Sequence, residues 1–373
     1  MAVPVFRPTV KRKDMGSVLS CIVSDRIGPG EISRDLAARA CHLLGHAGGV
    51  SLANGYLAVS VALEALGLAA ADAVIVSALA PALWLRVIQD KGIVPLVADV
   101  EADSASIDPA QAASLVQKGA KAIMVPHTMG IIADIQALRA HGLPILEDAS
   151  QALGGKLGEA ACGSAADICL LSLEPESIVT CGGGALVLGR TRQMASALKR
   201  IQESSPLYSP LADMNAALGI AQLAALESFV AVRREVAAAY AQALLKSRHA
   251  SLIQKIDAEN VLSSFPVTLS DGMKDVRQYA LKKNVDTMPA FAETIAALEQ
   301  SRAAPENPPP AAPGNVAAAA RGSLAAAVPE NPPLAAHCPN ARSLVLRCLL
   351  FPLYPMLGKR DVEAVCRVLS TLP

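Results

Sequence analysis

Short apolar, often β-branched runs alternate with helical patterns from about residue 50 to residue 190. Helical segments such as Tyr56 to Leu66 and Pro109 to Lys118 lie between the runs and have the usual length of a crossover. This alternation predicts an α/β fold with a mostly parallel sheet and helices on both faces. Function in such a sheet gathers at the carboxyl ends of the strands. The runs are VIVSAL (74–79), VPLVADV (94–100), AIMVPH (122–127), PILEDAS (144–150) and ICLLSL (168–173).

The length of 373 residues allows two domains whose cores need neither disulfides nor metal. We expect a large α/β domain over residues 1–240 and a small C-terminal domain over 241–373. An Ala-rich stretch at 215–245 predicts one long helix, or two nearly continuous ones, between them. Residues 302–336 are rich in Ala, Pro and Asn and predict a flexible insert, for which a plain linker is favoured over a site for a proline-reading partner.

Charge and cysteine content narrow the classes of partner. Lys plus Arg and Asp plus Glu both total 33. This balance gives the chain neither a positive field that would attract nucleic acid nor an acidic tail that would attract a cationic partner. The eight cysteines lack paired CxxC spacing, so we expect mostly buried thiols in a reducing compartment and no metal site. The N-terminal segment lacks the apolar run of a signal peptide, so a cytoplasmic location is expected.

The apolar stretch from Leu66 to Leu85 is about as long as a membrane span. Asp72 and Pro81 interrupt it. A helix that ends at Gly67, a turn, a buried strand and a new helix near Pro81 account for the same residues, because buried parallel strands read as continuous apolar runs. We therefore expect no membrane partner.

Two polar residues lie at and just past the carboxyl end of the strand PILEDAS. Asp148 and Gln151 lie where an open α/β sheet binds its ligand. The alternative is that Asp148 only caps the next turn, which this fragment by itself supports equally well.

The wider pattern resembles the DegT/DnrJ/EryC1/StrS family of aminotransferases, which use pyridoxal phosphate (PLP) to aminate nucleotide-linked keto-sugars. The resemblance covers most of the chain and implies the aspartate aminotransferase-like fold (fold type I). Its order and spacing are more specific than any single motif. The matching segments include IGPGEI (27–32), LANGYLAVSVALEALGL (52–68), VPHTMGIIADI (125–135), EDASQALGGKLG (147–158), GSAADICLLSL (163–173), CGGGALVLG (181–189) and FPLYPMLGKRDVEAV (351–365).

The resemblance implies a set of cofactor-binding residues. Asp148 matches the carboxylate that pairs with the protonated pyridine nitrogen, and Gln151 matches the residue that contacts the ring hydroxyl. Ser172 matches the serine that contacts the phosphate. The phosphate would also rest on a turn at a helix N-terminus, where Gly55 is retained and Tyr56 replaces the family's threonine.

The Schiff-base lysine of the family is missing. It lies four or five residues after the serine that matches Ser172, and those positions hold Glu176 and Ser177 here. No lysine occurs between Lys156 and Lys199. Without that amine, the cofactor has no covalent tether and the proton transfers of transamination lack their usual base.

Other contacts implied by the resemblance are replaced as well. Pro81 aligns with the aromatic residue that stacks on the ring. Tyr208 or Ser209 aligns with the phosphate-binding Asn from the partner subunit. The segment after 284–289 lacks the Tyr and His of the sugar-binding loop. His127 matches a family position but suits a structural histidine equally, and Gly182 to Gly184 read as a turn.

These features predict a degenerate family member without confident catalytic residues. PLP is expected either not to bind or to bind without a covalent bond. The protein would bind a ligand, such as a nucleotide-sugar-like molecule, or serve as a partner subunit, as a homodimer or as a heterodimer with an intact paralogue. The alternatives are a PLP-dependent sugar aminotransferase or a lysine-free sugar dehydratase with Glu176 as base, acting in cell-surface polysaccharide biosynthesis.

Overall fold

The computed structural model describes residues 2–204, 210–252, 258–303 and 334–373. Its main sheet has seven strands in the order β1-β9-β8-β5-β4-β2-β3. All neighbours are parallel except that β9 is antiparallel to both β1 and β8. Each of the predicted runs forms a strand of this sheet, so the predicted α/β fold is confirmed. The strands are β1 (Gly48–Leu52), β2 (Ala73–Ser77), β3 (Val94–Ala98), β4 (Ala120–Pro126), β5 (Ile145–Asp148), β8 (Ile168–Ser172) and β9 (Ala185–Gly189).

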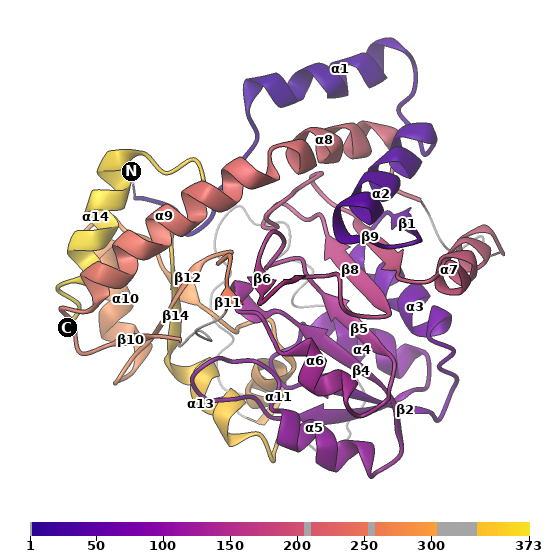
Figure 1. Ribbon diagram of the computed structural model, residues 1–373. Helices are drawn as coiled ribbons and strands as arrows, with labels where there is room; N and C mark the ends of the chain where they lie inside the picture. Colours follow the sequence, from indigo (N-terminus) through magenta and orange to yellow (C-terminus); the bar gives the residue numbers. More distant parts are fainter. Residues whose placement is uncertain (1, 205–209, 253–257, 304–333) are drawn as a thin grey trace.

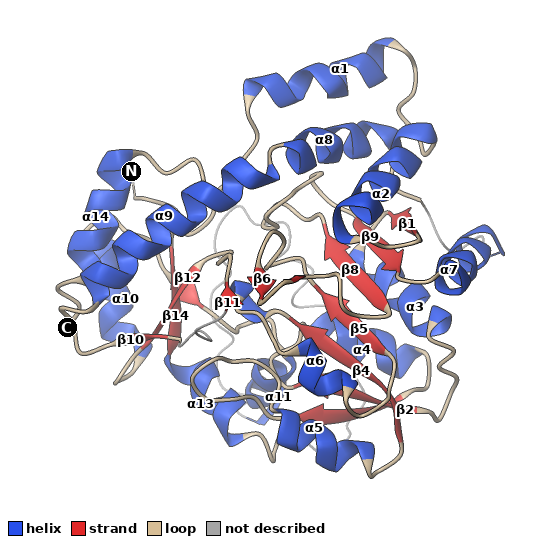
Figure 2. Ribbon diagram, viewed as in Figure 1, coloured by secondary structure: helices blue, strands red, loops and turns tan. Residues whose placement is uncertain are grey.

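Helices cover both faces of the main sheet (Figure 2). Side chains alternate along each strand, so Val74 and Val76 pack with α3, α4 and α7 on one face, whereas Ile75 packs with α5 on the other. A third apolar cluster joins α2 to β8 and β9. The helices are α2 (Glu31–Leu44), α3 (Gly55–Ala65), α4 (Ala82–Asp90), α5 (Pro109–Val116), α6 (Ile135–Arg139) and α7 (Arg192–Ser204).

Two smaller sheets follow. One is a short sheet of three strands, β11-β6-β7; the other is antiparallel, in the order β10-β12-β14-β13, and is packed by C-terminal helices around its own apolar cluster (Figure 1). The predicted insert at 302–336 lies mostly outside the described residues. The elements are β6 (Lys156–Leu157), β7 (Ala160–Ala161), β10 (Ala250–Ser251), β11 (Ala258–Glu259), β12 (Phe265–Thr268), α10 (Met273–Lys282), β13 (Met288–Pro289), α11 (Ile295–Ala303), α13 (Pro339–Arg347), β14 (Cys348–Phe351) and α14 (Lys359–Leu369).

A bent pair of helices links the large sheet to the C-terminal elements, in agreement with the predicted two nearly continuous helices. Helix α8 (Asp213–Ala224) and helix α9 (Leu226–Leu244) meet at an angle of 59°. Arg233 of α9 is 3% exposed, and its Nη1 donates to the carbonyls of Leu262, Ser263 and Leu353 at 2.8–3.2 Å. A buried guanidinium thereby ties α9 to the segments that enter and leave the small sheet.

An N-terminal arm packs on α8. It consists of a 3₁₀ turn (η1, Arg12–Asp14) and helix α1 (Met15–Val23), which Figure 1 shows lying along α8 at the top of the molecule. The thiol of Cys21 approaches the carbonyl of Asp213 at 3.8 Å. On the outer side Met15, Leu19 and Ile22 are 53%, 54% and 48% exposed. The sequence patterns did not identify this exposed apolar helix.

The apolar stretch at 66–85 folds as expected. Gly67 has φ +78° just after α3, strand β2 is buried, and Pro81 is the N-cap of α4. Among the described helices no single one is long and apolar enough to cross a membrane; α8 and α9 reach that threshold only as a bent pair. All eight cysteines are free thiols, and all but Cys366 are buried, as expected.

Candidate functional site

Asp148 is the last residue of β5, at the carboxyl edge of the main sheet. Its Oδ1 accepts hydrogen bonds from the backbone N–H of Ser150, at 2.9 Å, and from the hydroxyl of Ser150. The expected turn-capping contact therefore exists, but it occupies only one carboxylate oxygen. Among the described residues none donates to Oδ2. Burial raises the pKa of Asp148 above its usual value, and the Ser150 hydrogen bonds only partly offset this.

The same serine connects Asp148 to Ser172. The Oγ of Ser150 accepts from the backbone N–H of Ser172 at 2.6 Å. Strands β5 and β8 are neighbours, with Asp148 opposite Leu170, so the two site residues end adjacent strands. The hydroxyl of Ser172 forms no hydrogen bond with any described residue. The structure thus brings together the two residues that the resemblance assigns to the two ends of one cofactor.

Gly55 lies at the same edge, at the start of α3. Across β9, Ala185 pairs with both Ser172 and Leu52, the last residue of β1. Asn54 caps α3, since its side chain accepts from the backbone N–H of Leu57 at 3.0 Å. The amide of Gly55, at the first helical position, has no intrahelical acceptor and suits an anion.

The hydroxyl of Tyr56 faces a neighbouring helix instead of a phosphate group. It donates to Oδ2 of Asp90 at 2.8 Å, and the Nε of Arg86 donates to the same oxygen at 2.8 Å. Desolvation alone would raise the pKa of Asp90, but these two hydrogen bonds hold it below its usual value. Tyr56 therefore joins α3 to α4, and only its backbone occupies the position expected of a phosphate contact.

Gln151 holds a strained turn. Its side-chain Oε1 accepts from the backbone N–H of Met129 at 2.6 Å. Met129 has φ +56°, and Gly130 follows at φ +90°. A Cβ at Gly130 would lie 2.1 Å from the carbonyl oxygen of Val261, so only glycine fits there. Gln151 is exposed and lies next to the site, consistent with a ring contact, but its oxygen is already bonded.

His127 and Glu147 form a buried pair beneath Asp148. The Nδ1 of His127 accepts from the backbone N–H of Ala133 at 3.0 Å, so Nε2 carries the proton and donates to Oε1 of Glu147 at 2.8 Å. Glu147 also accepts from the amides of Gly163, at 2.6 Å, and Ala166, at 3.2 Å. Desolvation would raise the pKa of Glu147, but these donors lower it below its usual range. His127 is thus bonded at both ring nitrogens and is structural.

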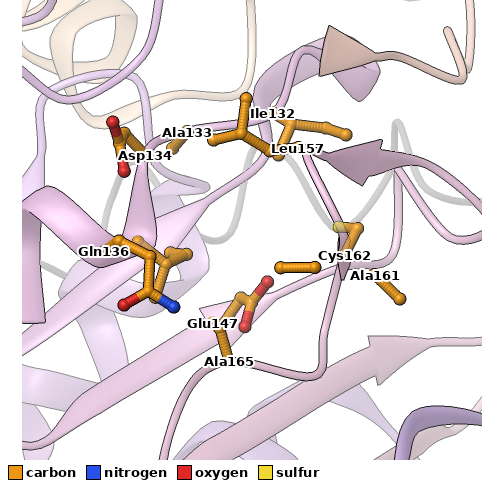
Figure 3. A pocket seen from close by; sticks show the side chains of 11 residues that line it. Ile132, Ala133, Asp134, Gln136, Glu147, Leu157, Ala161, Cys162 and Ala165 are labelled. Carbon is orange, nitrogen blue, oxygen red and sulfur yellow. The ribbon is translucent and has the colours of Figure 1, made fainter. Parts of the chain in front are cut away.

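Cys162 lies close to this pair and lines a cavity of about 220 Å³ with Glu147 (Figure 3). The ligand atoms of His127, Glu147 and Cys162 lie within 4.8 Å of one another. The histidine has no lone pair for a metal ion, because one nitrogen accepts a hydrogen bond and the other is protonated. Burial also raises the pKa of Cys162 well above its usual value. The cluster therefore does not have the chemistry of a metal centre.

The loop that should carry the lysine is fixed at both ends. The backbone N–H of Leu173 donates to the carbonyl of Gly184, and the carbonyl of Leu173 accepts from the backbone N–H of Cys181 and, at 3.1 Å, from the hydroxyl of Thr180. Between these anchors Glu176 is exposed and Ser177 is half-buried. The loop leaves the carboxyl end of β8, directly beside Asp148 on β5.

Pro81, which aligns with the expected stacking aromatic, is half-buried and lies beside the C-terminal part of the chain. It forms an isolated bridge with Thr294, and Ala82 donates to the carbonyl of Glu293 at 2.8 Å. Tyr208 and Ser209, aligned with the partner-supplied Asn, lie outside the described residues. Sequence analysis did not identify Ser150 or Glu147, although both belong to the EDASQ segment.

The residues present fit the non-covalent part of a pyridoxal phosphate site. Asp148 has an open oxygen for a protonated ring nitrogen, and the Ser172 hydroxyl and the Gly55 amide can donate to a phosphate. They do not fit the covalent part, because the loop at 174–177 contains no amine. The cofactor implied by the resemblance could therefore be bound and oriented here, but not tethered from this loop.

Several solved structures match the chain over nearly its whole length. The sugar aminotransferase CalS13 from Micromonospora echinospora has a TM-score of 0.80 at 18% identity, over 99% of both chains. The aminotransferase TlmJ from Streptoalloteichus hindustanus has a TM-score of 0.81 at 20% identity, over 99% of this chain and 97% of that chain. Spr1654 from Streptococcus pneumoniae is assigned as a sugar aminotransferase. Its PLP form has a TM-score of 0.82 at 17% identity, over 99% of this chain and 98% of that chain.

At these identities the structures show the fold, which is that of PLP-dependent sugar aminotransferases. The family model extends the match to sequence and covers residues 8–322. The chain therefore belongs to the DegT/DnrJ/EryC1/StrS aminotransferase family.

Proposed function

We propose that this chain is a degenerate member of its family that binds a pyridoxal-phosphate-like ligand without a covalent bond and does not transaminate by the lysine route. The absence of lysine from residues 157–198 carries this proposal. The lysines nearest in sequence are poorly placed to compensate. Lys156 is exposed in β6, and Lys199 is exposed on α7 beside Glu203.

Bound pyridoxal phosphate would supply an electron sink through its ring. Asp148 would hold the proton on the ring nitrogen with its free Oδ2, and Ser150 would keep the carboxylate in place. The hydroxyl of Ser172 and the amide of Gly55 would orient the phosphate. The residues at 174–177 provide no amine to bond the substrate-facing carbon or to move a proton there. The site would bind and orient its ligand but lacks the usual base.

The test is to mix the purified protein with pyridoxal phosphate, record absorbance between roughly 330 and 430 nm, and reduce with borohydride before gel filtration. The proposal expects saturable binding that gel filtration removes, with no pyridoxyl group on any lysine by mass spectrometry. One specifically labelled lysine would overturn it and would identify a sugar aminotransferase, the reading that the family match supports equally.

The second candidate is a lysine-free sugar dehydratase in which Glu176 acts as the base. The position of Glu176 in the loop beside Asp148 favours this candidate, whereas the solvent exposure of Glu176 disfavours it. Turnover of a nucleotide-linked keto-sugar that Glu176→Gln abolishes, and that Glu363→Gln on α14 leaves intact, would establish it. Turnover that survives Glu176→Gln would exclude it.

We further propose that the chain works as a homodimer or as a heterodimer with an intact paralogue. The exposed apolar side chains of Met15, Leu19 and Ile22 on α1 support an unfilled contact surface of this kind. Light scattering on the purified chain, alone and mixed with the paralogue, distinguishes the two assemblies. A monomer that stays monomeric in the mixture would contradict both.

A further inference from the structure

A second cavity lies between helix α9 and the small antiparallel sheet. It has a volume of about 390 Å³, and Asp148, Ser172 and Gly55 are not among the described residues that line it. Its inner wall is made of the buried side chains of Ile131, Leu252, Leu262 and Phe265. An engineered apolar cavity of about 150 Å³ already holds benzene. The cavity beside α9 therefore has room for a larger apolar group.

Small side chains on α9 leave this cavity open to solvent. Ala237, Ala238 and Ala241 line it from the helix, and Ala238 and Ala241 are exposed. A methyl group covers little of the apolar wall behind it, whereas a leucine at the same position would reach across the opening. A ligand can therefore enter beside α9 while the helix stays in place.

One polar group in the cavity wall has no partner among the described residues. The Oδ1 of Asn260 accepts from the backbone N–H of Ile132 at 2.8 Å, so Nδ2 is the free end of this amide. Asn260 lines the cavity, is 8% exposed, and has a buried Nδ2 without a hydrogen bond. A buried N–H without an acceptor is unfavourable, and an oxygen atom of a ligand would satisfy it.

A guanidinium also lines the cavity, on the residue of α9 that contacts the neighbour of Asn260. The Nη2 of Arg234 donates to the carbonyl of Glu259 at 3.2 Å and lies 3.3 Å from its carboxylate. Both side chains are exposed, so this ion pair contributes little. The other N–H groups of Arg234 have no acceptor among the described residues, and no described carboxylate lines the cavity. The polar part of the cavity thus favours an anion.

We propose that this cavity binds a small carboxylate with an apolar chain, such as a medium-chain fatty acid. The chain would lie against Leu252, Leu262 and Phe265, and the carboxylate would accept from Arg234 and Asn260. A mainly apolar wall with a few polar groups is the usual form of a small-molecule site. The inference does not depend on the proposed function, because the residues assigned to the cofactor lie elsewhere.

The experiment measures the binding of hexanoate, octanoate and decanoate to the purified chain by calorimetry. Each additional methylene that becomes buried should lower the dissociation constant about four-fold, so octanoate should bind about 15-fold more tightly than hexanoate. This gain should stop once the cavity is full. We expect one molecule bound per chain. Failure of all three carboxylates to bind saturably would overturn the site.

A substitution that fills the cavity locates the ligand. Ala241→Leu should weaken octanoate binding about ten-fold or more, because the leucine occupies space that the chain needs. Ala231→Leu is the matched control, since Ala231 is exposed on the same helix and does not line the cavity. Circular dichroism verifies that both variants are folded. Octanoate binding that Ala241→Leu leaves intact would place the ligand elsewhere and overturn the assignment.

Charge substitutions test the carboxylate contacts. Arg234→Gln should weaken octanoate about five-fold and leave the neutral 1-octanol unchanged, because one close charge pair in water is removed. Arg190→Gln is the control, because the Arg190 side chain is equally exposed, at 39%, and also pairs with an aspartate or glutamate. Asn260→Asp keeps the oxygen that accepts from Ile132 but replaces the donor, so it should also weaken octanoate selectively. Equal effects of Arg234→Gln on octanoate and 1-octanol would refute recognition of the carboxylate.

Discussion

Replacement of Glu147 by glutamine tests whether the buried pair beneath Asp148 stabilises the fold. In the native chain its carboxylate accepts from His127, Gly163 and Ala166 at 2.6–3.2 Å. Glutamine can still accept from His127 and Gly163, but its amide N–H₂ would then face the N–H of Ala166. A buried donor left unpaired costs about 1–3 kcal/mol, so we take about 2 kcal/mol as the loss in the free energy of unfolding.

Calorimetry can measure this loss as a shift in melting temperature. A chain of 373 residues has an unfolding entropy of about 0.8 kcal/mol/K, so about 2 kcal/mol corresponds to a decrease in Tm of about 2.5 °C. The control is Glu159→Gln, an exposed carboxylate in the turn between β6 and β7, for which we expect less than about 0.5 °C. Equal Tm values for the two variants would refute a stabilising role for the Glu147 network.

The stability difference between the native chain and Glu147→Gln should depend on pH, because the pKa of Glu147 is lowered in the folded chain. A carboxyl group whose pKa is lower in the folded chain makes its full contribution to stability when the pH is above its pKa in the unfolded chain. For Glu147 that unfolded-state pKa is near 4.5. That contribution is lost as the pH falls through the folded pKa. The difference in unfolding free energy between the native chain and the Glu147→Gln variant should therefore be constant from neutral pH down to about pH 5. It should shrink below about pH 4. A gap that widens on acidification would contradict the assigned direction.

Asp148→Asn should leave Tm unchanged or slightly higher, because burial disfavours the native carboxylate, while calorimetry should show ligand binding weakened about ten-fold or more; a large drop in Tm would mean that the charge itself stabilises the fold. Arg233→Met should cost about 3 kcal/mol in thermal unfolding, since three buried carbonyls lose their donor; no change would show that water replaces the guanidinium. Tyr56→Phe should cost under about 1 kcal/mol in the same assay, because Asp90 keeps Arg86; a larger loss would indicate that Tyr56 does more than join two helices. Ellman's reagent should react promptly with one thiol in the native chain and with none in Cys366→Ser; several fast thiols would contradict the burial of the others.

The strands that the sequence predicts best are those whose side chains are buried on both faces. Val74 to Val76 and Ile168 to Leu171 form unbroken apolar runs because helices cover the sheet from both sides. Strand β1 was missed, since its residues Gly48 to Leu52 include two glycines and a serine. Strand β9 was not among the predicted runs either, and its antiparallel direction was not predictable, because residue patterns reveal periodicity but not strand direction.

The candidate site was predictable where a single motif carries it and not where topology assembles it. Asp148, Gln151 and Ser172 follow from their positions at strand ends and from the family resemblance. The link through Ser150 was not predicted, because it joins residues 22 apart along the chain that only the pairing of β5 with β8 makes neighbours. The same holds for His127 and Glu147, which are 20 residues apart and meet across β4 and β5.

The N-terminal arm also has a consequence for synthesis on the ribosome. Helix α1 packs on α8, and the contact between Cys21 and Asp213 spans 192 positions of the chain. At about 5–20 residues per second, the ribosome needs roughly 10–40 s to make the partner of a helix that it has already released. For that time the side of α1 that carries Cys21 has no native surface to cover it, in addition to the apolar side chains that stay exposed in the folded chain. The nascent chain therefore offers a binding segment for chaperones well before its main sheet can close.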